Sequence, residues 1–583
     1  MLNKNNHATS GRPFRAGSAE HAGSLRLRPL ALAVALALNG GLAYTVHAAP
    51  NAGCAGSPTA ECTDVPADGI RYTSGVGTVN VGDGVPGTTT VNTGTTGIEL
   101  SRTGVSGAVA PDADFDTIEW DTDDDPDTAE VDVVSQDGST PHLVDGDYIT
   151  VKTYDSNGDP ASFGIGADTY TGLQLAEYLA ANSSGSGTAI SGSLTINNDA
   201  GPGSGGAPFG TTNASGIAIG SVGGNGGSGG CYSILLIYTW CDNGYKGGDA
   251  GSVAVNSNSI ITVYGDATGR HAVTAISQGG IGGNGGGFIG LVSDAGAGGN
   301  GGTGALVSVL LGPDSFLTTH GDKSHGVFAQ SRGGDGGSGG DAGGAGALGS
   351  AGGNGGDAGN VLVTNQGGIL TKGWNSHGIY ARSVGAGAGS GSNAGGIYAE
   401  GGNGGGESSG AAVTINNSGS ITTELSDAFG ILAQSIGGGG GDGGGAGGWF
   451  TVGGRGGSGG GSGVVTVLDS GTVKTGSALG GDRATAIFAQ SIGGGGGNGG
   501  DAVSLSSTIS VAVGGAGGLG GAGNNVTVTT DGSDIETIGD DAHGIHAQSV
   551  GGGGGNGGLA VSGALGGTSP FGVSVAMGGN GGG

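Results

Sequence analysis

Charged residues, aromatic residues and proline are all scarce in this sequence. Lys, Arg, Asp and Glu make up 11% of the residues, the aromatic residues make up 5%, and 14 of the 583 residues are proline. So few rings and charges argue against an ordinary globular core. Basic residues number 17 against 47 acidic ones, and the formal net charge of −30 makes nucleic acid an unfavourable partner.

Only four cysteines are present, and they form two close pairs along the chain. The pairs are Cys54 with Cys62 and Cys231 with Cys241. In an exported chain this spacing predicts two local disulfides, each stabilising by roughly 2 to 3 kcal/mol. Zinc sites use tighter spacings, so we do not expect one here.

The apolar run LALAVALAL at residues 30–38 is too short to span a membrane comfortably, because that takes about 20 residues. It follows a polar stretch with four arginines, and it precedes Val46 and Ala48, which fit the small-residue rule for cleavage. We therefore predict a signal peptide over residues 1–48 and export of the mature chain.

Glycine, by contrast, supplies 150 residues. A short apolar segment with a serine near its end, called the word below, precedes seven of the glycine tracts. One copy reads FGILAQSI at residues 429–436 and is followed by GGGGG at residues 437–441. The seven serines are Ser221, Ser277, Ser331, Ser383, Ser435, Ser491 and Ser549. They are separated by 52 to 58 residues, and a period of this length is typical of a solenoid or array.

Side chains alternate within the word as they do in a β-strand. Ile431, Ala433 and Ser435 belong to a face that hardly changes between copies, so we expect this face to point inward and the variable face to be exposed. Two more short strand candidates precede each word, as at residues 413–415 and 421–423. Three short strands are the size of one coil of a parallel β-helix, so the sequence predicts an all-β solenoid of about seven repeats.

The glycine tracts occupy the other half of each repeat. Ordering glycine costs more backbone entropy than ordering any other residue, whereas lengthening a flexible loop costs about 0.6 kcal/mol per doubling. We therefore expect the tracts to be flexible surface loops. The alternative is that stretches such as TISVAVGGAGG at residues 508–518 are strands of a second coil in each repeat.

The leader, the repeated word with its glycine tract, and the VTV strands with NSG-type turns together resemble the passenger region of bacterial autotransporters. The resemblance covers residues 186–583 best. It implies a right-handed β-helical passenger at the cell surface and a C-terminal outer-membrane barrel. Alternating ten-residue segments of such a barrel are missing from the sequence, so we expect a chain truncated before its translocator.

On this basis the sequence divides into three parts. Residues 1–48 are the signal peptide, residues 49–185 are an acidic, β-rich N-terminal cap, and residues 186–583 are the glycine-rich repeats.

Clustered carboxylates in the run DTDDDPDTAEVD form the one candidate metal site. Hard cations prefer oxygen ligands, so weak calcium binding is the hypothesis, against the alternative of a solvated acidic face. Its residues are Asp121, Asp123, Asp124, Asp125 and Asp127. No other cofactor is expected.

Two polar residue types recur at fixed positions of the word. His271, His325, His377 and His543 share one register, where a metal-binding ladder is possible, although a turn residue entering a strand is the better interpretation. Four glutamines share another register and predict an amide ladder on an outer face. They are Gln330, Gln434, Gln490 and Gln548.

Two apolar stretches lie where solvated loops would be expected, CYSILLIYTWC at residues 231–241 and GGWFTVGG at residues 447–454. The simpler interpretation is that both fold back over the solenoid or cap it. The functional hypothesis is a contact surface, because rigidly presented aromatic side chains favour binding. The predicted contact residues are Leu235, Ile237, Tyr238, Trp240, Trp449 and Phe450.

No catalytic set can be assembled from these residues, so the sequence does not predict an enzyme. It favours an adhesin or binding scaffold that recognises a ligand on a host or neighbouring cell and reaches the outer membrane through a barrel that this chain does not contain. A self-associating surface coat is the alternative, and a secreted enzyme carried on a β-helix is a weaker one.

Overall fold

Short apolar stretches separated by turns form strands throughout the described part of the chain. The computed structural model describes residues 215–234, 238–478, 480–564 and 572–583, together with strands β1 to β12 in the preceding part. Across these described residues the regular structure consists of strands alone. No helix in them is long and apolar enough to cross a membrane.

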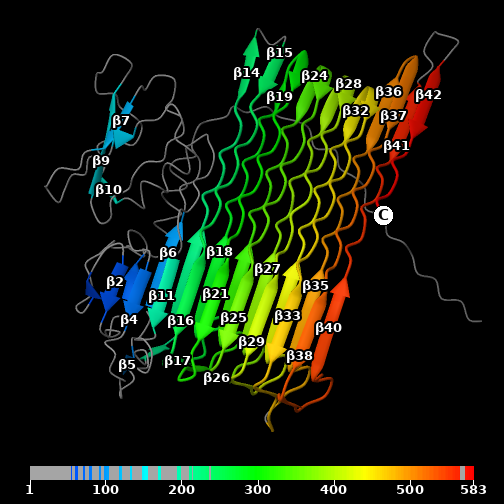
Figure 1. Ribbon diagram of the computed structural model, residues 1–583. Helices are drawn as coiled ribbons and strands as arrows, with labels where there is room; N and C mark the ends of the chain where they lie inside the picture. Colours follow the sequence, from blue (N-terminus) through cyan, green and yellow to red (C-terminus); the bar gives the residue numbers. More distant parts are fainter. Residues whose placement is uncertain are drawn as a thin grey trace, which may run out of the picture. The chain divides into compact units, whose positions relative to one another are not determined.

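Every repeat contributes one strand to each of three sheets, and equivalent strands of successive repeats are parallel neighbours (Figure 1). The first sheet contains β1 (Cys54–Ala55), β2 (Thr59–Cys62), β4 (Thr78–Val81), β11 (Leu194–Asn198), β16 (Val253–Ser257), β21 (Val307–Leu311), β25 (Val361–Asn365), β29 (Val413–Asn417), β33 (Val465–Asp469) and β38 (Val526–Thr530). The short strand β1, at the edge of this sheet, is antiparallel to β2. The second contains β5 (Val91–Asn92), β12 (Phe209–Thr212), β17 (Ile260–Tyr264), β22 (Phe316–Thr319), β26 (Gly368–Thr371), β30 (Ser420–Thr423), β34 (Thr472–Thr475) and β39 (Asp534–Thr537). The third contains β3 (Ile70–Tyr72), β6 (Ile98–Thr103), β13 (Ile217–Val222), β18 (Val273–Gln278), β23 (Val327–Arg332), β27 (Ile379–Val384), β31 (Ile431–Ile436), β35 (Ile487–Ile492) and β40 (Ile545–Val550).

The core lies between these three sheets and consists of aliphatic side chains stacked in register. In one repeat, Val413 and Ile415 of β29, Ile421 of β30, and Ile431 and Ala433 of β31 are all fully buried. Each forms part of a column with its equivalents in the repeats before and after, as in the pairing of Ile431 with Ile379 and Ile487. The predicted all-β parallel β-helix of about seven repeats is confirmed, and so is the inward face of the word.

The variable face of the word is less exposed than we expected. Its side chains stack on their equivalents one repeat away, as Phe328 does on Tyr380 with ring centroids 5.4 Å apart. Leu432 is buried because its neighbours in register are the large rings of Tyr380 and Phe488.

The serine at the end of the word has a structural role that explains why it recurs. The Ser435 hydroxyl donates to the Ala411 carbonyl at 2.8 Å and accepts from the Gly463 N–H at 2.7 Å. Ala411 and Gly463 are equivalent residues of consecutive repeats, so the buried hydroxyl joins the two. A buried polar group must have partners, and alanine or valine at this position would leave two backbone groups without them.

The β-helix begins earlier than the repeats recognised in the sequence. Strands β4, β5 and β6 pair in parallel with β11, β12 and β13 of the three sheets. Part of the predicted cap, residues 49–185, therefore contributes strands to the β-helix. Four further strands of that region form an antiparallel sheet in the order β10 (Thr169–Thr171), β9 (Tyr148–Tyr154), β7 (Thr117–Trp120) and β8 (Asp132–Val133).

The glycine tracts are ordered, and our prediction of flexible loops is wrong. After the third-sheet strand, an outgoing segment leads away from the β-helix, and after a turn a return segment leads back to it (Figure 1). The outgoing segments are residues 223–230, 279–287, 333–341, 385–393, 437–445, 493–501 and 551–559. The return segments are residues 242–252, 295–306, 349–360, 401–412, 453–464, 514–525 and 578–583.

Hydrogen bonds between these segments recur at every third residue, which is the repeat of an extended polyproline-II-type helix. The first residue of a triplet donates to the equivalent segment of the next repeat, as the Gly282 N–H does to the Asp335 carbonyl at 2.8 Å. The second donates to the opposite layer, as the Gly283 N–H does to the Tyr245 carbonyl at 2.8 Å. Outgoing and return segments thus form two hydrogen-bonded layers.

The third residue of the triplet faces outward, and asparagine or aspartate is frequent there. The Asn284 Oδ1 atom accepts from the Ser338 N–H at 2.9 Å, and the Asn300 Oδ1 atom accepts from the Asn354 N–H at 2.9 Å. In both pairs the donor lies at the same register one repeat later. The first two N–H groups of each triplet are paired with backbone carbonyls of the two layers, and the third is not. The asparagine of a Gly-Gly-Asn triplet supplies the acceptor for the third N–H of the equivalent triplet in the next repeat.

Glycine at the first two positions is required by the closeness of the backbones. A Cβ on Gly437 would overlap the carbonyl oxygen of Gly460, and a Cβ on Gly438 would overlap that of Ala386. At the third position, a Cβ on Gly439 would lie 3.8 Å from the Gly495 carbonyl oxygen, an ordinary contact. The flexible-loop prediction counted the entropy of ordering glycine and omitted the hydrogen bonds that such close packing allows.

At the far ends of the two layers a fourth sheet, the tip sheet, joins outgoing to return segments. It contains β14 (Cys231–Ile234), β15 (Tyr238–Cys241), β19 (Phe288–Ile289), β20 (Val292–Asp294), β24 (Ala342–Leu348), β28 (Ala394–Glu400), β32 (Ala446–Val452), β36 (Ala502–Ser506), β37 (Ile509–Val513), β41 (Ala560–Ala564) and β42 (Val573–Met577). Stretches proposed as a second coil, such as β37, are indeed strands. However, they belong to this sheet, and each repeat makes one coil.

We predict opposite outcomes for alanine at two adjacent glycines. Gly438→Ala should lower the free energy of unfolding by about 1 to 3 kcal/mol because its methyl group overlaps backbone. Gly439→Ala, its matched control, should be neutral or stabilise by up to about 1 kcal/mol through the unfolded chain. Urea denaturation of both variants measures this. Equal destabilisation by the two would contradict the packing described here.

Candidate functional site

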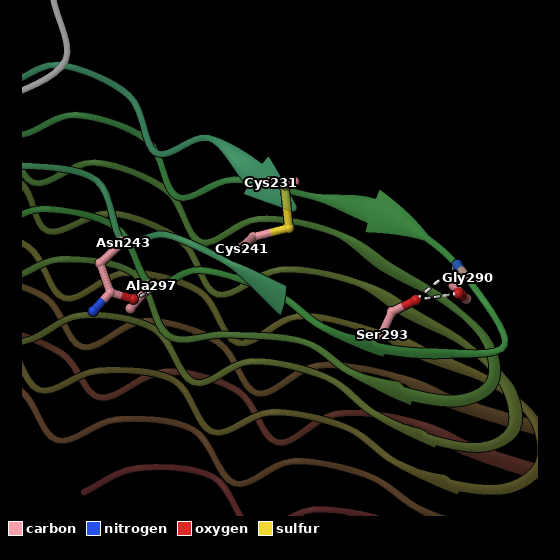
Figure 2. Close-up of a disulfide and its surroundings, with 7 residues drawn as sticks. Cys231, Cys241, Asn243, Gly290, Ser293 and Ala297 are labelled. Atoms are coloured by element: carbon pink, nitrogen blue, oxygen red, sulfur yellow. Dashed lines mark hydrogen bonds between the residues drawn. A yellow bond between two sulfur atoms is a disulfide. The ribbon is translucent and has the colours of Figure 1, made fainter. Parts of the chain in front are cut away.

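The predicted contact residues that the structure describes lie in the tip sheet. Strands β14 and β15 form an antiparallel hairpin with Cys231 opposite Cys241, and a disulfide joins the two cysteines (Figure 2). Trp240 at the end of this hairpin is 39% exposed. Leu235 and Ile237 lie outside the described residues, as does the side chain of Tyr238. The prediction of the second disulfide is confirmed.

The later apolar stretch is exposed and does not fold back over the β-helix. Trp449 and Phe450 of β32 are 46% and 39% exposed. Phe450 pairs in register with Tyr398 of β28 and with Val511 of β37, so a column of apolar side chains crosses three neighbouring repeats. The simpler interpretation is wrong for this stretch.

The exposed apolar surface is larger than the sequence indicated, because each repeat adds large side chains to the tip sheet. Ile289 is the most exposed of them at 77%. The others include Leu291, Val292, Leu348, Ile397, Tyr398, Val503, Leu505, Ile509 and Val561. Sequence reasoning missed most of these because short apolar stretches between glycines read as loops, although Ile509 lies in a stretch that was considered as a strand.

Small residues hold the two arms of the tip together and force the large ones outward. Ala342 and Ala347 of β24 are buried, as are Ala394 and Ala399 of β28. At the first described turn, the Ser293 hydroxyl accepts from the Gly290 N–H at 2.9 Å and donates to the Gly343 carbonyl at 2.6 Å (Figure 2). The interior between the arms accommodates only methyl groups and hydroxyls.

The layers that carry the tip are also tied laterally close to the disulfide. The Asn243 Oδ1 atom accepts from the Ala297 N–H at 2.7 Å, joining two successive return segments (Figure 2). The tip sheet is therefore attached to the β-helix by hydrogen-bonded segments rather than by free loops. Its apolar side chains are held in a fixed row, as a binding surface requires.

Three of the four histidines in this register form a stacked column, and the fourth, His543, instead lies edge-on to His546. The rings of His271 and His325 lie 4.6 Å apart, those of His325 and His377 lie 4.7 Å apart, and Phe429 continues the stack. The Nδ1 atom of each imidazole in the column accepts a hydrogen bond from the backbone N–H at the same register one repeat later. His271 Nδ1 accepts from the His325 N–H at 2.9 Å, and His325 Nδ1 accepts from the His377 N–H at 3.0 Å. The Nδ1 atoms are thus used in packing, which favours the structural interpretation over a metal ladder.

Burial makes these imidazoles hard to protonate. It lowers the pKa of His271 to about 4, helped by the nearby Arg270, and it lowers that of His377 to about 4 although Asp427 opposes the shift. His325, between two other histidines, has its pKa lowered well below its usual range, again mainly by burial.

Three of the four predicted glutamines form an amide ladder. The Gln434 Nε2 atom donates to Gln490 Oε1 at 3.1 Å, and the Gln490 Nε2 atom donates to Gln548 Oε1 at 2.8 Å. Gln330 departs from the ladder because its Oε1 accepts from the Arg382 Nε at 2.6 Å.

The predicted calcium ligands Asp121, Asp123, Asp124, Asp125 and Asp127 lie outside the described residues. Among the residues that the structure does describe, no group of three or more His, Cys, Asp or Glu could hold a metal ion. Strands β1 and β2 place Cys54 opposite Cys62, and the side chains of these cysteines also lie outside the described part.

No known protein family, curated protein or solved structure matches this chain. Its function has to be inferred from its own surface.

The histidine column predicts loss of stability in acid. In the unfolded chain these imidazoles take up protons below pH 6.5, whereas in the folded chain His377 does so only near pH 4. Stability is therefore complete above pH 6.5 and declines as the pH falls toward 4. At pH 5 the loss from His377 is about 2 kcal/mol.

Thermal melting at pH 7.5 and pH 5 measures this effect in the unmodified chain and in His377→Phe, which keeps the stacking seen naturally at Phe429. The variant should lose less stability on acidification than the unmodified chain. An equal acid-induced loss in both would show that His377 is not responsible.

Proposed function

We propose that this chain is a surface-exposed or secreted passenger of the autotransporter type, acting as an adhesin whose binding surface is the tip sheet. Its leader supports export, and its parallel β-helix supports the resemblance to a passenger. The observation that carries the binding function is the row of exposed apolar side chains along the tip. Isolated exposed apolar residues are normal, but contiguous ones mark interaction sites.

The surrounding structure supports a binding surface rather than an incidental patch. Trp449, Phe450 and Tyr398 are of the residue types that dominate binding energy when a partner buries them. The two glycine layers place them at the end of each repeat furthest from the coil. The ligand in this proposal is displayed on a host or neighbouring cell.

Self-association into a surface coat is the competing function, because an apolar row can bury itself against a second copy. The net charge of −30 opposes close approach of two copies. We therefore rank a foreign ligand first, and sedimentation of the purified chain separates the two cases.

Replacing the aromatic pair should abolish attachment without unfolding the repeats. We expect Trp449→Ser with Phe450→Ser to weaken binding to apolar beads and to target cells at least tenfold, because truncating one such anchor costs about 2 kcal/mol. Leu468→Ser is the matched control, since Leu468 is 45% exposed but lies on the first sheet.

Retention on phenyl-coated beads and cell-attachment counts measure the effect, with circular dichroism to check folding. Attachment unchanged in the double variant, or lost equally in Leu468→Ser, would refute the tip sheet as the binding surface.

A further inference from the structure

A glycine-floored trough crosses the tip sheet on the side of the outgoing segments. Two shallow, open grooves of about 610 and 800 Å³ lie next to each other, with Gly344 lining both, and together they are called the trough. Its floor consists of a Gly-Gly pair from each of three neighbouring strands, β24, β28 and β32. The pairs are Gly343 with Gly344, Gly395 with Gly396, and Gly447 with Gly448.

In two of the three pairs the fold requires only the second glycine, whereas a Cβ on Gly343 would lie 3.1 Å from the Ile289 side chain. A Cβ on Gly344 would overlap the Gly290 carbonyl oxygen, and a Cβ on Gly448 would overlap that of Gly396. A Cβ on Gly395 would come no closer than 4.0 Å to any atom, and one on Gly447 would meet nothing within 4 Å. Packing does not explain why these two positions lack a side chain.

The next two repeats show that the same position accepts a bulky residue. Gly343, Gly395 and Gly447 pair in register with one another, and the column continues into Val503 and then Val561. Both valines are exposed. Glycine inside a strand often marks a place where a ligand or another backbone approaches closely. The glycines at 395 and 447 thus keep the trough open.

The walls of the trough differ in chemistry at its two ends. Ile397, Trp449, Val503 and Leu505 make one end apolar. The other end combines the apolar side chains of Phe288 and Ile289 with Asp341, whose carboxylate is exposed at the surface. A ligand that fills the trough therefore meets apolar side chains along it and a carboxylate at one end.

The face around the trough is acidic. Among the outward third positions of the seven outgoing segments, none is Lys or Arg and four are aspartate, Asp335, Asp341, Asp442 and Asp501. One of these, Asp335, is paired with Arg332 at 2.9 Å. The return segments carry two basic residues, Lys246 and Arg455, and two acidic ones, Asp249 and Asp357, at such positions, so the excess of negative charge belongs to the side that bears the trough.

We propose that the trough binds an extended polypeptide segment in which apolar side chains alternate with basic ones. The flat floor admits a backbone, the apolar wall takes the apolar side chains, and the acidic face attracts the basic ones. The same charge disfavours anionic lipid and a second copy of this chain. This assignment specifies the partner of the proposed binding surface and rests on that proposal.

Titration of the full chain with synthetic octapeptides tests the assignment, with Trp fluorescence and calorimetry as readouts. A Leu-Lys alternating peptide should bind at least tenfold more tightly than a Leu-Glu peptide, and binding should weaken with added salt. Gly395→Val with Gly447→Val should reduce the affinity for the Leu-Lys peptide at least tenfold while leaving the melting temperature unchanged. Gly439→Val, an outward glycine outside the trough, is the matched control.

Asp341→Asn supplies an independent variant, because asparagine keeps the acceptor that the Asn393 N–H uses at 2.8 Å while removing the charge. It should weaken binding of the Leu-Lys peptide and reduce its salt dependence. Equal affinity for both peptides, full affinity in the valine double variant, or preference for phosphatidylcholine vesicles or self-association would overturn the proposal. If the peptide fails to bind while Trp449→Ser still abolishes cell attachment, this inference fails and the adhesin function stands.

Discussion

Hydrogen bonding between glycine backbones is the interaction on which the rest of this structure depends. An extended three-residue helix makes no hydrogen bonds within itself, so each N–H must find a partner on a neighbouring segment or in water. Absence of Cβ atoms at two positions of each triplet lets segments approach closely enough for those bonds. The β-helix keeps the segments in register, and the segments in turn fix the position of the tip sheet.

The strands of the β-helix could be predicted because their signal is local and repeated. Alternation in the word identified the buried face around Ile431 and Ala433. One coil was missed because β6 reads IELSRT, with Arg102 in the register of Ser221, so it lacks the serine that marks the other words. Such a coil is recognisable only once its neighbours show which residues must stack on it.

The ordered structure of the glycine tracts could not be predicted from the entropy cost of each glycine taken alone. Glycine is the most expensive residue to order, and that cost dominates when a tract is considered alone. The three-residue period of the tracts is the feature that indicates an ordered structure. In GGNGGSGG at residues 223–230, for example, every third residue is larger than glycine. Asparagine there is explained by a bond to the next repeat, as Asn225 Oδ1 makes with the Ile281 N–H at 2.9 Å. Sequence reasoning likewise picked out Trp240 and Trp449, but few of the other exposed apolar residues of the tip sheet, because only continuous apolar stretches stood out.

The large apolar side chains of the tip sheet are exposed because the space between its two arms is too narrow to hold them. Burying Trp449 or Ile397 would require space between the two arms, which Ala394, Ala399 and Ala446 already fill. Moving the arms apart would break the hydrogen bonds between layers, as at Gly444 and Gly402, 2.7 Å apart from N to O. Each of these half-exposed side chains forgoes roughly half of the free energy of complete burial, or about 1 kcal/mol. Since the fold offers these residues no interior, a second molecule is the remaining way for that free energy to be gained.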